Sequence, residues 1–276
     1  MKKLLIACML LAGGFAQASA QELSPKDFGY FNHLSGGIVL GTEGIGIEVA
    51  APITYDFAVR MGYSLMPKFK YSKSLNLNEN KGAFIKDRVD IGGKLNMGDF
   101  KLLVDWYPFR TSSFHATAGF FIGRSTVVKI DNKEPFVKDN YKGVAGIELG
   151  VYDPSNPQSE SRYTLMTDPN GDIKGELEVN AFKPYLGVGF GRAVPKGRIG
   201  VQFDLGIQFW GKPELKANMN YVDRETGENV TNFEPVKIGR ITNPDSDYQD
   251  LKDAVKTIQK IRVYPVLNIR INGRIF

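Results

Sequence analysis

Cysteine is almost absent from this chain: its 276 residues contain one, Cys8. Cys8 lies in an N-terminal stretch with the features of a secretory leader, namely a basic start, an apolar run and the small residues Ala-Ser-Ala at 18–20. We expect residues 1–20 to be removed as a signal peptide and residues 21–276 to form one mature domain. A mature chain without cysteine has no disulfide, no thiolate metal site and no cysteine nucleophile.

Long apolar runs and clusters of one charge are also missing. After the leader, no apolar run approaches the roughly 18–20 residues that a membrane helix needs. The net charge is only +5, from 35 Lys and Arg against 30 Asp and Glu, and the cations are spread along the chain. This distribution argues against nucleic-acid binding. If the protein enters a membrane, it does so with strands.

What the chain has in abundance is strict two-residue alternation, most clearly between Phe182 and Trp210. Two arms flank a short polar turn, which predicts a β-hairpin. One face of the second arm is apolar and the other is small or polar: Ile199, Val201, Phe203, Leu205, Ile207 and Phe209 alternate with Gly200, Gln202, Asp204, Gly206 and Gln208. Glycine, glutamine and aspartate opposite a row of large apolar residues suit a barrel wall with lipid outside and a narrow polar interior.

The same alternation recurs along most of the chain and predicts an all-β, antiparallel transmembrane β-barrel. We expect about ten strands, within a range of eight to twelve, with both termini in the periplasm. Nine strands are clear, and we expect a tenth from residues 146–179. The competing interpretation is a secreted β-sandwich. The nine segments are 35–41, 45–51, 57–65, 89–95, 102–106, 114–122, 184–190, 199–209 and 263–275.

Two long segments, residues 129–181 and 211–260, interrupt the alternation and read as irregular outer loops. Loops of this length are unusual in compact soluble domains but ordinary on the outer side of a barrel. A helical stripe from Ser246 to Ile261 predicts one short helix before the last strand, which caps the barrel or packs on its rim.

The leader, the arms PYLGVGFGRA and RIGVQFDLGIQFWGKP, and a final strand that ends on an aromatic residue resemble the small porin-like outer-membrane β-barrel proteins of Gram-negative bacteria. The resemblance implies location in the bacterial outer membrane, contact with outer-membrane lipid and lipopolysaccharide, and no cofactor. It also implies that Phe276 is an assembly signal read by the barrel-assembly machinery. In this sequence Ile275, and not Phe276, is in phase with the lipid-facing residues.

Charged residues in the inward phase carry the main prediction about function. Because charges in a narrow lumen must pair, a nearly balanced set favours a lumen closed by ion pairs over a wide pore, with a narrow pore as the alternative. The predicted network contains Glu48, Arg60, Asp90, Lys94, Lys101, Asp105, Asp204, Arg270 and Arg274.

Aromatic residues near strand ends predict a girdle at the boundaries between membrane and water, with ordinary core packing as the alternative. The six members are Trp106, Tyr107, Phe109, Phe209, Trp210 and Tyr264.

Two hypotheses about activity remain open at this point. The first is a structural, binding or narrow-pore barrel whose specificity for a small solute or a surface partner lies in the long outer loops. The second is an outer-membrane lipid-modifying enzyme or protease that uses His115, which shares the inward phase with Asp105 and Tyr107. No Ser-His-Asp spacing is legible, so the sequence favours the first hypothesis, and we expect no metal site.

Overall fold

The computed structural model describes residues 24–67, 70–76, 88–132, 135, 139, 146–150, 162–166, 170, 172, 174–222, 229–235 and 256–275. Within these ranges the chain is almost entirely antiparallel β-structure, apart from a short 3-10 turn at Pro25–Asp27 and helical residues 256–260. None of the described helical segments has the length and apolar character needed to cross a membrane. The predicted leader and Phe276 lie outside the described residues.

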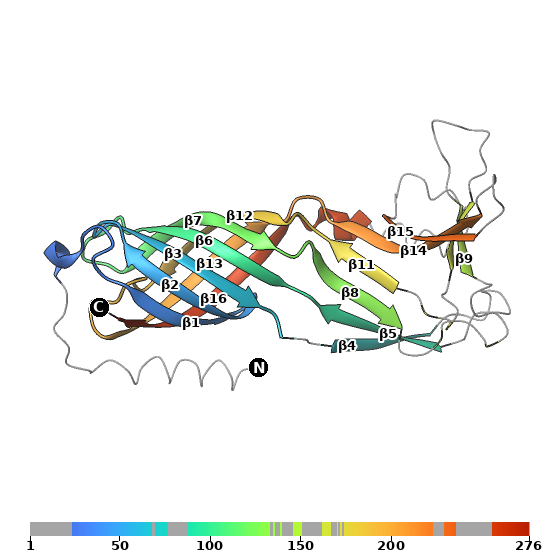
Figure 1. The fold of residues 1–276 in the computed structure, drawn as a ribbon, viewed down its shortest axis with the longest axis horizontal. Coiled ribbons are helices and arrows are strands. Elements are labelled where there is room, and N and C mark those ends of the chain that lie inside the picture. Colours follow the sequence, from blue (N-terminus) through green and yellow to red (C-terminus); the bar gives the residue numbers. More distant parts are fainter. Residues whose placement is uncertain are drawn as a thin grey trace, which may run out of the picture.

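Eight of the described strands form a closed barrel in the order β1-β16-β13-β12-β7-β6-β3-β2 (Figure 1). The antiparallel barrel is therefore confirmed, but with eight strands in place of the ten or so expected. The barrel strands are β1 (Ser35–Gly41), β2 (Gly44–Pro52), β3 (Phe57–Leu65), β6 (Gly98–Trp106), β7 (Phe114–Gly123), β12 (Phe182–Phe190), β13 (Ile199–Phe209) and β16 (Val263–Arg274).

The first and last barrel strands pair with each other, with Ser35 opposite Arg274. Both described ends of the chain therefore lie at the same end of the barrel, which we call the terminal end. The connections at this end are short. At the opposite, distal end, three of the four connections are long and lead into a second sheet (Figure 1).

The second sheet corrects the prediction of irregular outer loops. Its order is β4-β5-β8-β11-β14-β10-β9, and β15 pairs with β14. Residues 129–181 and 211–260 thus contain described strands, and the strand expected to complete the barrel from residues 146–179 belongs to this sheet instead. The strands are β4 (Lys70–Asn76), β5 (Arg88–Leu95), β8 (Thr126–Asn132), β9 (Gly146–Gly150), β10 (Arg162–Met166), β11 (Lys174–Glu178), β14 (Glu214–Val222) and β15 (Asn229–Pro235).

One predicted barrel strand, β5, also lies in the second sheet, where it pairs with β4 and β8. The reason is that alternation reports two different faces but not the partner strand, and both sheets have two different faces. The helix prediction is met in part, because residues 256–260 are helical and residues 246–255 lie outside the described residues.

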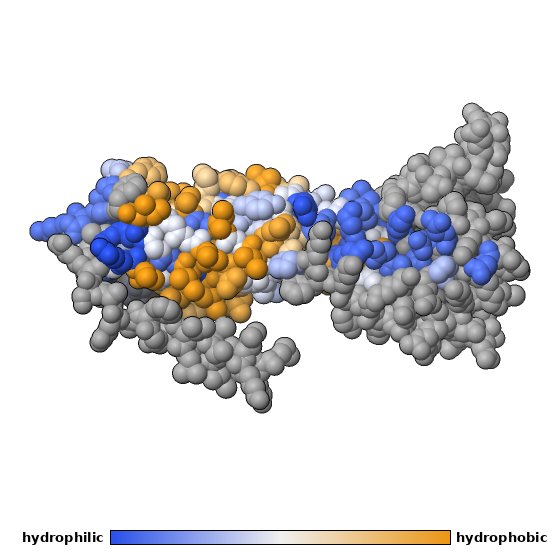
Figure 2. Space-filling model, turned by 60° about the horizontal axis from the view of Figure 1, so that its bottom comes forward, coloured by the Kyte–Doolittle hydropathy of each residue, from blue (hydrophilic) through white to orange (hydrophobic). Residues whose placement is uncertain are grey.

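The face of the barrel in Figure 2 carries large apolar patches, shown in orange, whereas the described part of the second sheet is mainly hydrophilic on this face. Outward side chains such as Ile47, Leu186 and Leu205 are 69%, 54% and 58% exposed. An apolar surface of this extent around a closed barrel is what a lipid bilayer covers.

Candidate functional site: the closed lumen

The lumen of the barrel is filled with polar and charged side chains that are almost fully buried. They come from the inward positions of the strands, which alternate with the apolar outward positions. We call the central set the lumen network: Glu43, Glu48, Arg60, Lys101, Asp105, His115, Gln202, Asp204 and Arg270.

Arg60, on β3, lies at the centre of the lumen network. Its Nη1 is 2.9 Å from Oδ2 of Asp204 on β13, and its Nη2 is 2.8 Å from Oδ1 of Asp105 on β6. The Nη1 atom is also 3.5 Å from Oε2 of Glu48 on β2. In the barrel order, β13 is four strands away from β3, so Arg60 connects opposite walls.

Glu48 joins three cations. Its Oε1 forms an ion pair with Lys101 Nζ at 2.5 Å. Its Oε2 lies 3.2 Å from Nε of Arg270 and 3.5 Å from Nη1 of Arg60. All four side chains are at most 2% exposed. Buried charges are costly unless they are paired and hydrogen-bonded, and here each faces at least one opposite charge.

His115 belongs to the same network and is fully buried. Its Nε2 lies 2.9 Å from Oδ1 of Asp204 and 3.1 Å from Nε2 of Gln202, while its Nδ1 is 3.3 Å from the carbonyl oxygen of Ser113. The ring also packs against Tyr107 at 5.4 Å between centroids. These contacts hold His115 inside the wall without exposure to a substrate, so the enzyme alternative finds no support.

The distal half of the lumen contains charges that the sequence analysis did not single out. Glu43 comes from the turn between β1 and β2, and Lys183 on β12 pairs with Asp99 on β6 at 2.6 Å. The inward phase could have revealed Lys183, because it alternates with the outward Phe182 and Pro184. No periodic signal could have revealed Glu43, because a turn has no strand phase.

An apolar layer lies where the barrel meets the second sheet. It consists of residues at the ends of several strands: Met66, Met97, Val127, Val179 and Trp210, with Tyr264 against them. Trp210 and Tyr264 stack with centroids 4.6 Å apart. This layer covers the distal end of the lumen, and we call it the apolar plate.

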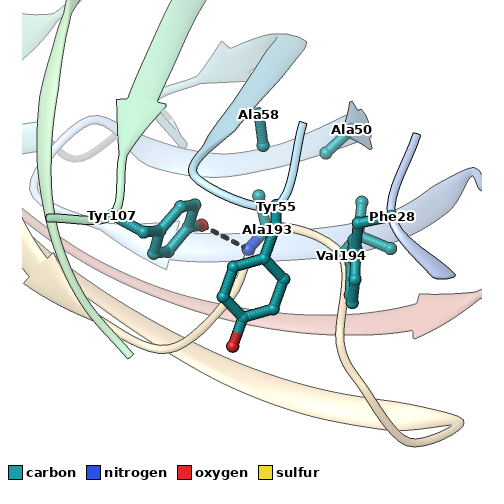
Figure 3. Close-up of a cluster of buried hydrophobic side chains, with 7 residues drawn as sticks. All are labelled: Phe28, Ala50, Tyr55, Ala58, Tyr107, Ala193 and Val194. Atoms are coloured by element: carbon teal, nitrogen blue, oxygen red, sulfur yellow. Dashed lines mark hydrogen bonds between the residues drawn. The ribbon is translucent and has the colours of Figure 1, made fainter. Parts of the chain in front are cut away.

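The terminal end is filled by the loop that follows β12. Ala193 and Val194 lie among buried aromatic side chains, and the Ala193 amide donates to the Tyr107 hydroxyl at 2.9 Å (Figure 3). The guanidinium of Arg192 lies 4.0 Å from the ring centre of Tyr55, 4.5 Å from that of Tyr107 and 5.3 Å from that of Phe28. Phe28 comes from the N-terminal lead, so this segment helps to fill the terminal mouth.

The structure brings together six of the nine charges predicted for the lumen: Glu48, Arg60, Lys101, Asp105, Asp204 and Arg270.

The other three require correction. Lys94 lies on β5 of the second sheet, where it pairs with Asp131, and Asp90 lies on the same strand. Arg274 is half-buried at the terminal rim and donates to the carbonyl of Lys196 at 2.7 Å. For Lys94 and Asp90 the prediction of a strand was right and the sheet was wrong.

The aromatic girdle is also corrected. Trp106, Phe109 and Phe209 are 49%, 56% and 37% exposed and lie on the outer surface.

Tyr107 and Trp210, by contrast, are 2% and 7% exposed, and Tyr264 is half-buried against Trp210. These three residues occupy the inward phase of their strands. The phase of a residue, and not its closeness to a strand end, therefore decides whether its side chain is buried. The alternative interpretation, packing within the protein, is right for them.

No group of three or more histidine, cysteine, aspartate or glutamate side chains suited to a metal ion occurs in the described ranges.

No protein-family model and no curated protein matches this chain. Among solved structures, it is similar to the crystal structure of Acinetobacter baumannii CarO2, with 17% identity and a TM-score of 0.45 over 88% of this chain and 98% of that one. It is also similar to Acinetobacter baumannii CarO, with 16% identity and a TM-score of 0.42 over 87% and 96% of the two chains. Values this low assign neither an activity nor a ligand.

The resemblance to small porin-like outer-membrane barrels, predicted from the sequence, is confirmed. The chain forms a closed antiparallel barrel with an apolar outer surface and a polar interior, which is the arrangement of that class.

Proposed function

We propose that this chain is a bacterial outer-membrane β-barrel whose lumen is closed, and that it acts as a structural scaffold for a binding surface on the second sheet. The observation that carries the proposal is the position of Arg60, which binds carboxylates from opposite walls across the lumen. A pore needs a water-filled path, and this side chain with its partners occupies the place where that path would run.

The apolar plate supports the same conclusion, because it fills the distal end of the lumen. The rings of Phe28, Tyr55 and Tyr107 around Arg192 fill the terminal end. A channel would instead expose charged rings to water at its mouths. The narrow-pore alternative thus requires at least three layers of side chains to move.

The second sheet supports the binding part of the proposal. Specificity in proteins with a rigid scaffold usually lies in the segments that the scaffold presents, and here all three long distal connections contribute strands to one sheet. Lipopolysaccharide, outer-membrane lipid, a small solute and a surface protein are the candidate ligands.

Conductance in planar bilayers tests closure. We expect little steady current from the unmodified protein and a higher current from Arg60→Ala, because that substitution removes the central cross-connection. Arg110→Ala is the matched control, since its pair with Asp56 is largely exposed at 3.7 Å. A large steady current from the unmodified protein would replace the closed barrel with a porin.

Fractionation and binding test the rest. We expect heat-modifiable migration on a gel, recovery in the outer membrane and a mature N-terminus at Gln21. Lipopolysaccharide and intact cells serve as binding probes, and a variant without residues 214–235 should lose binding while the barrel still shows heat-modifiable migration. Recovery as a soluble periplasmic protein would contradict the proposal.

A further inference from the structure

The turn between β1 and β2 carries a charged residue where it would not normally be buried. Turn residues usually face water, yet Glu43 is 3% exposed and points into the distal half of the lumen. The position of this side chain is therefore set by the turn and not by the alternation of a strand.

Glu43 binds groups on both sides of the barrel. Its Oε1 accepts a hydrogen bond from Nε2 of Gln208 on β13 at 2.8 Å, and its Oε2 accepts one from Nδ2 of Asn268 on β16 at 3.3 Å. On the other side, Ser64 Oγ on β3 and Lys101 Nζ on β6 each lie 3.4 Å from Oε2. The carboxylate thus crosses the lumen on the distal side of Arg60 and its partners Asp105 and Asp204, which we call the Arg60 layer.

The backbone of the turn requires glycine on both sides. A Cβ atom at Gly41 would lie 2.2 Å from the carbonyl oxygen of Leu267. Gly44 has a φ of +100°, and a Cβ there would lie 2.3 Å from the carbonyl oxygen of Leu65. Because backbone atoms cannot move aside as a side chain can, only glycine allows the turn to lie this close to β16 and β3.

Most partners of Glu43 are neutral. Among the described residues, Lys101 is its one ion-pair partner, and Lys101 lies closer to Glu48, at 2.5 Å against 3.4 Å. The other lumen carboxylates, such as Asp204 and Asp99, have a cation within 2.9 Å or less. Glu43 is therefore a turn residue whose carboxylate is bound mainly by side-chain amides. The other lumen carboxylates lie on strands and are bound mainly by cations.

We propose that Glu43 is the stopper of the distal half of the lumen. Withdrawal of this one side chain opens the space around Ser64 and Lys101, beneath the apolar plate, to small neutral molecules that pass the plate, while the Arg60 layer stays closed. The inference rests on the proposed closed lumen and adds to it a specific residue on a turn.

Cysteine accessibility tests the stopper, because the one cysteine of the chain, Cys8, lies in the predicted signal peptide. Ser64→Cys places a thiol beside Glu43, and a small neutral methanethiosulfonate reagent is added to intact cells. We expect Ser64→Cys alone to react slowly and the double variant with Glu43→Gly to react about tenfold faster or more, since exposure limits the thiol's reaction. Equal rates would overturn the proposal and leave the apolar plate as the distal barrier.

Two further variants separate this inference from the closed lumen itself. Thr117→Cys lies in the Arg60 layer, 3.4 Å from Arg60 Nη2, and should stay unreactive in both backgrounds. Reaction of Thr117→Cys with Glu43 intact would contradict the closed lumen. If Thr117→Cys reacts only when Glu43→Gly is also present, loss of Glu43 opens the Arg60 layer too. That result would overturn the inference that Glu43 closes the distal half alone.

The controls address folding and background. Glu178→Gln removes a half-buried carboxylate of the second sheet and should leave the reactivity of Ser64→Cys unchanged. If Glu43→Gly does not reach the heat-modifiable form, Glu43→Ala serves instead, because it also removes the carboxylate and the Cγ methylene group that fill the space. With that variant we expect a several-fold faster reaction, and an unchanged rate would count against the stopper.

Discussion

The barrel and the second sheet use the same ion-pair chemistry in opposite environments. Arg60 and Asp204 are 2.9 Å apart with side chains 2% and 4% exposed, whereas Lys129 and Glu176 are also 2.9 Å apart with side chains 50% and 26% exposed. The buried side chains of Arg60 and Asp204 cannot replace each other with water, whereas the exposed side chains of Lys129 and Glu176 can. Equal distances therefore hide unequal contributions to stability.

The comparison also explains why the two sheets can differ in role. In the barrel, each buried charge needs its partners in place, so the lumen is expected to be rigid and intolerant of substitution. In the second sheet, charges sit on a hydrated surface where they can change partners. A surface of that kind can bind a ligand without a large cost to the fold.

The largest expected effect comes from Arg60→Ala. It leaves Asp105, Asp204 and Glu48 buried with fewer cations, and removing one member of a buried pair typically costs about 3–5 kcal/mol. Urea unfolding of the refolded protein in detergent micelles would measure the loss. A change below about 1 kcal/mol would mean that water replaces the guanidinium and that the barrel and the sheet do not differ.

Arg60→Lys sharpens the same test. A lysine keeps the charge but cannot bind Asp105 and Asp204 with two separate nitrogen atoms as Arg60 does. We expect an intermediate loss of stability. A loss equal to that of Arg60→Ala would show that geometry, and not charge alone, sets the contribution.

A smaller loss is expected from His115→Ala, which removes the buried contact with Asp204 Oδ1 while Arg60 Nη2 still reaches that oxygen at 3.1 Å. A hydrogen bond to a charged group contributes about 1.5–3 kcal/mol. His33→Ala is the matched control, because His33 lies in the N-terminal lead outside the barrel wall, and its loss should be smaller. Equal effects in urea unfolding would argue against a structural role of His115 in the network.

In the second sheet, Lys129→Ala should change stability by no more than about 1 kcal/mol, because exposed ion pairs contribute little. The same urea experiment measures it, and limited proteolysis reports on the sheet separately. A loss comparable to that of Arg60→Ala would mean that the pair with Glu176 is protected from water in a way that its exposure does not indicate.

The smallest effect is a pH dependence of the second sheet. The hydrogen bond to Glu178 raises the pKa of Lys216 above its ordinary value of 10.5. A raised lysine pKa adds stability that is fully present below 10.5 and is lost as the pH rises through the folded value. The contribution of Lys216 to the protease resistance of the sheet should therefore stay constant between pH 7 and pH 9. Above pH 10.5 the unmodified protein should lose this part of its protease resistance, and Lys216→Ala should not show that decrease.

Strand phase was the most reliable source of prediction for the site. Alternation placed Arg60, Lys101, Asp105, Asp204 and Arg270 inside before any partner strand was known, because successive side chains of a strand point to opposite faces. The same rule would have excluded Tyr107 from the girdle, had phase been given priority over the position near a strand end.

Partner strands were the least predictable feature. The alternation of β5 is as regular as that of β6, yet β5 pairs in the second sheet and β6 in the barrel. Lys94 was misplaced for this reason, and residues 129–181 and 211–260 were misread as irregular because short strands between turn residues give weak periodic signals.

The sequence by itself determined the class of the fold, the inward and outward faces of the barrel strands, and most of the buried charges, since these follow from local periodicity. Only the tertiary structure decided that eight strands close the barrel, that the long connections join in a second sheet and that Glu43 enters the lumen. Each of these depends on contacts between residues far apart in the chain, such as Glu43 with Gln208 and Asn268, and local periodicity contains no information about such contacts.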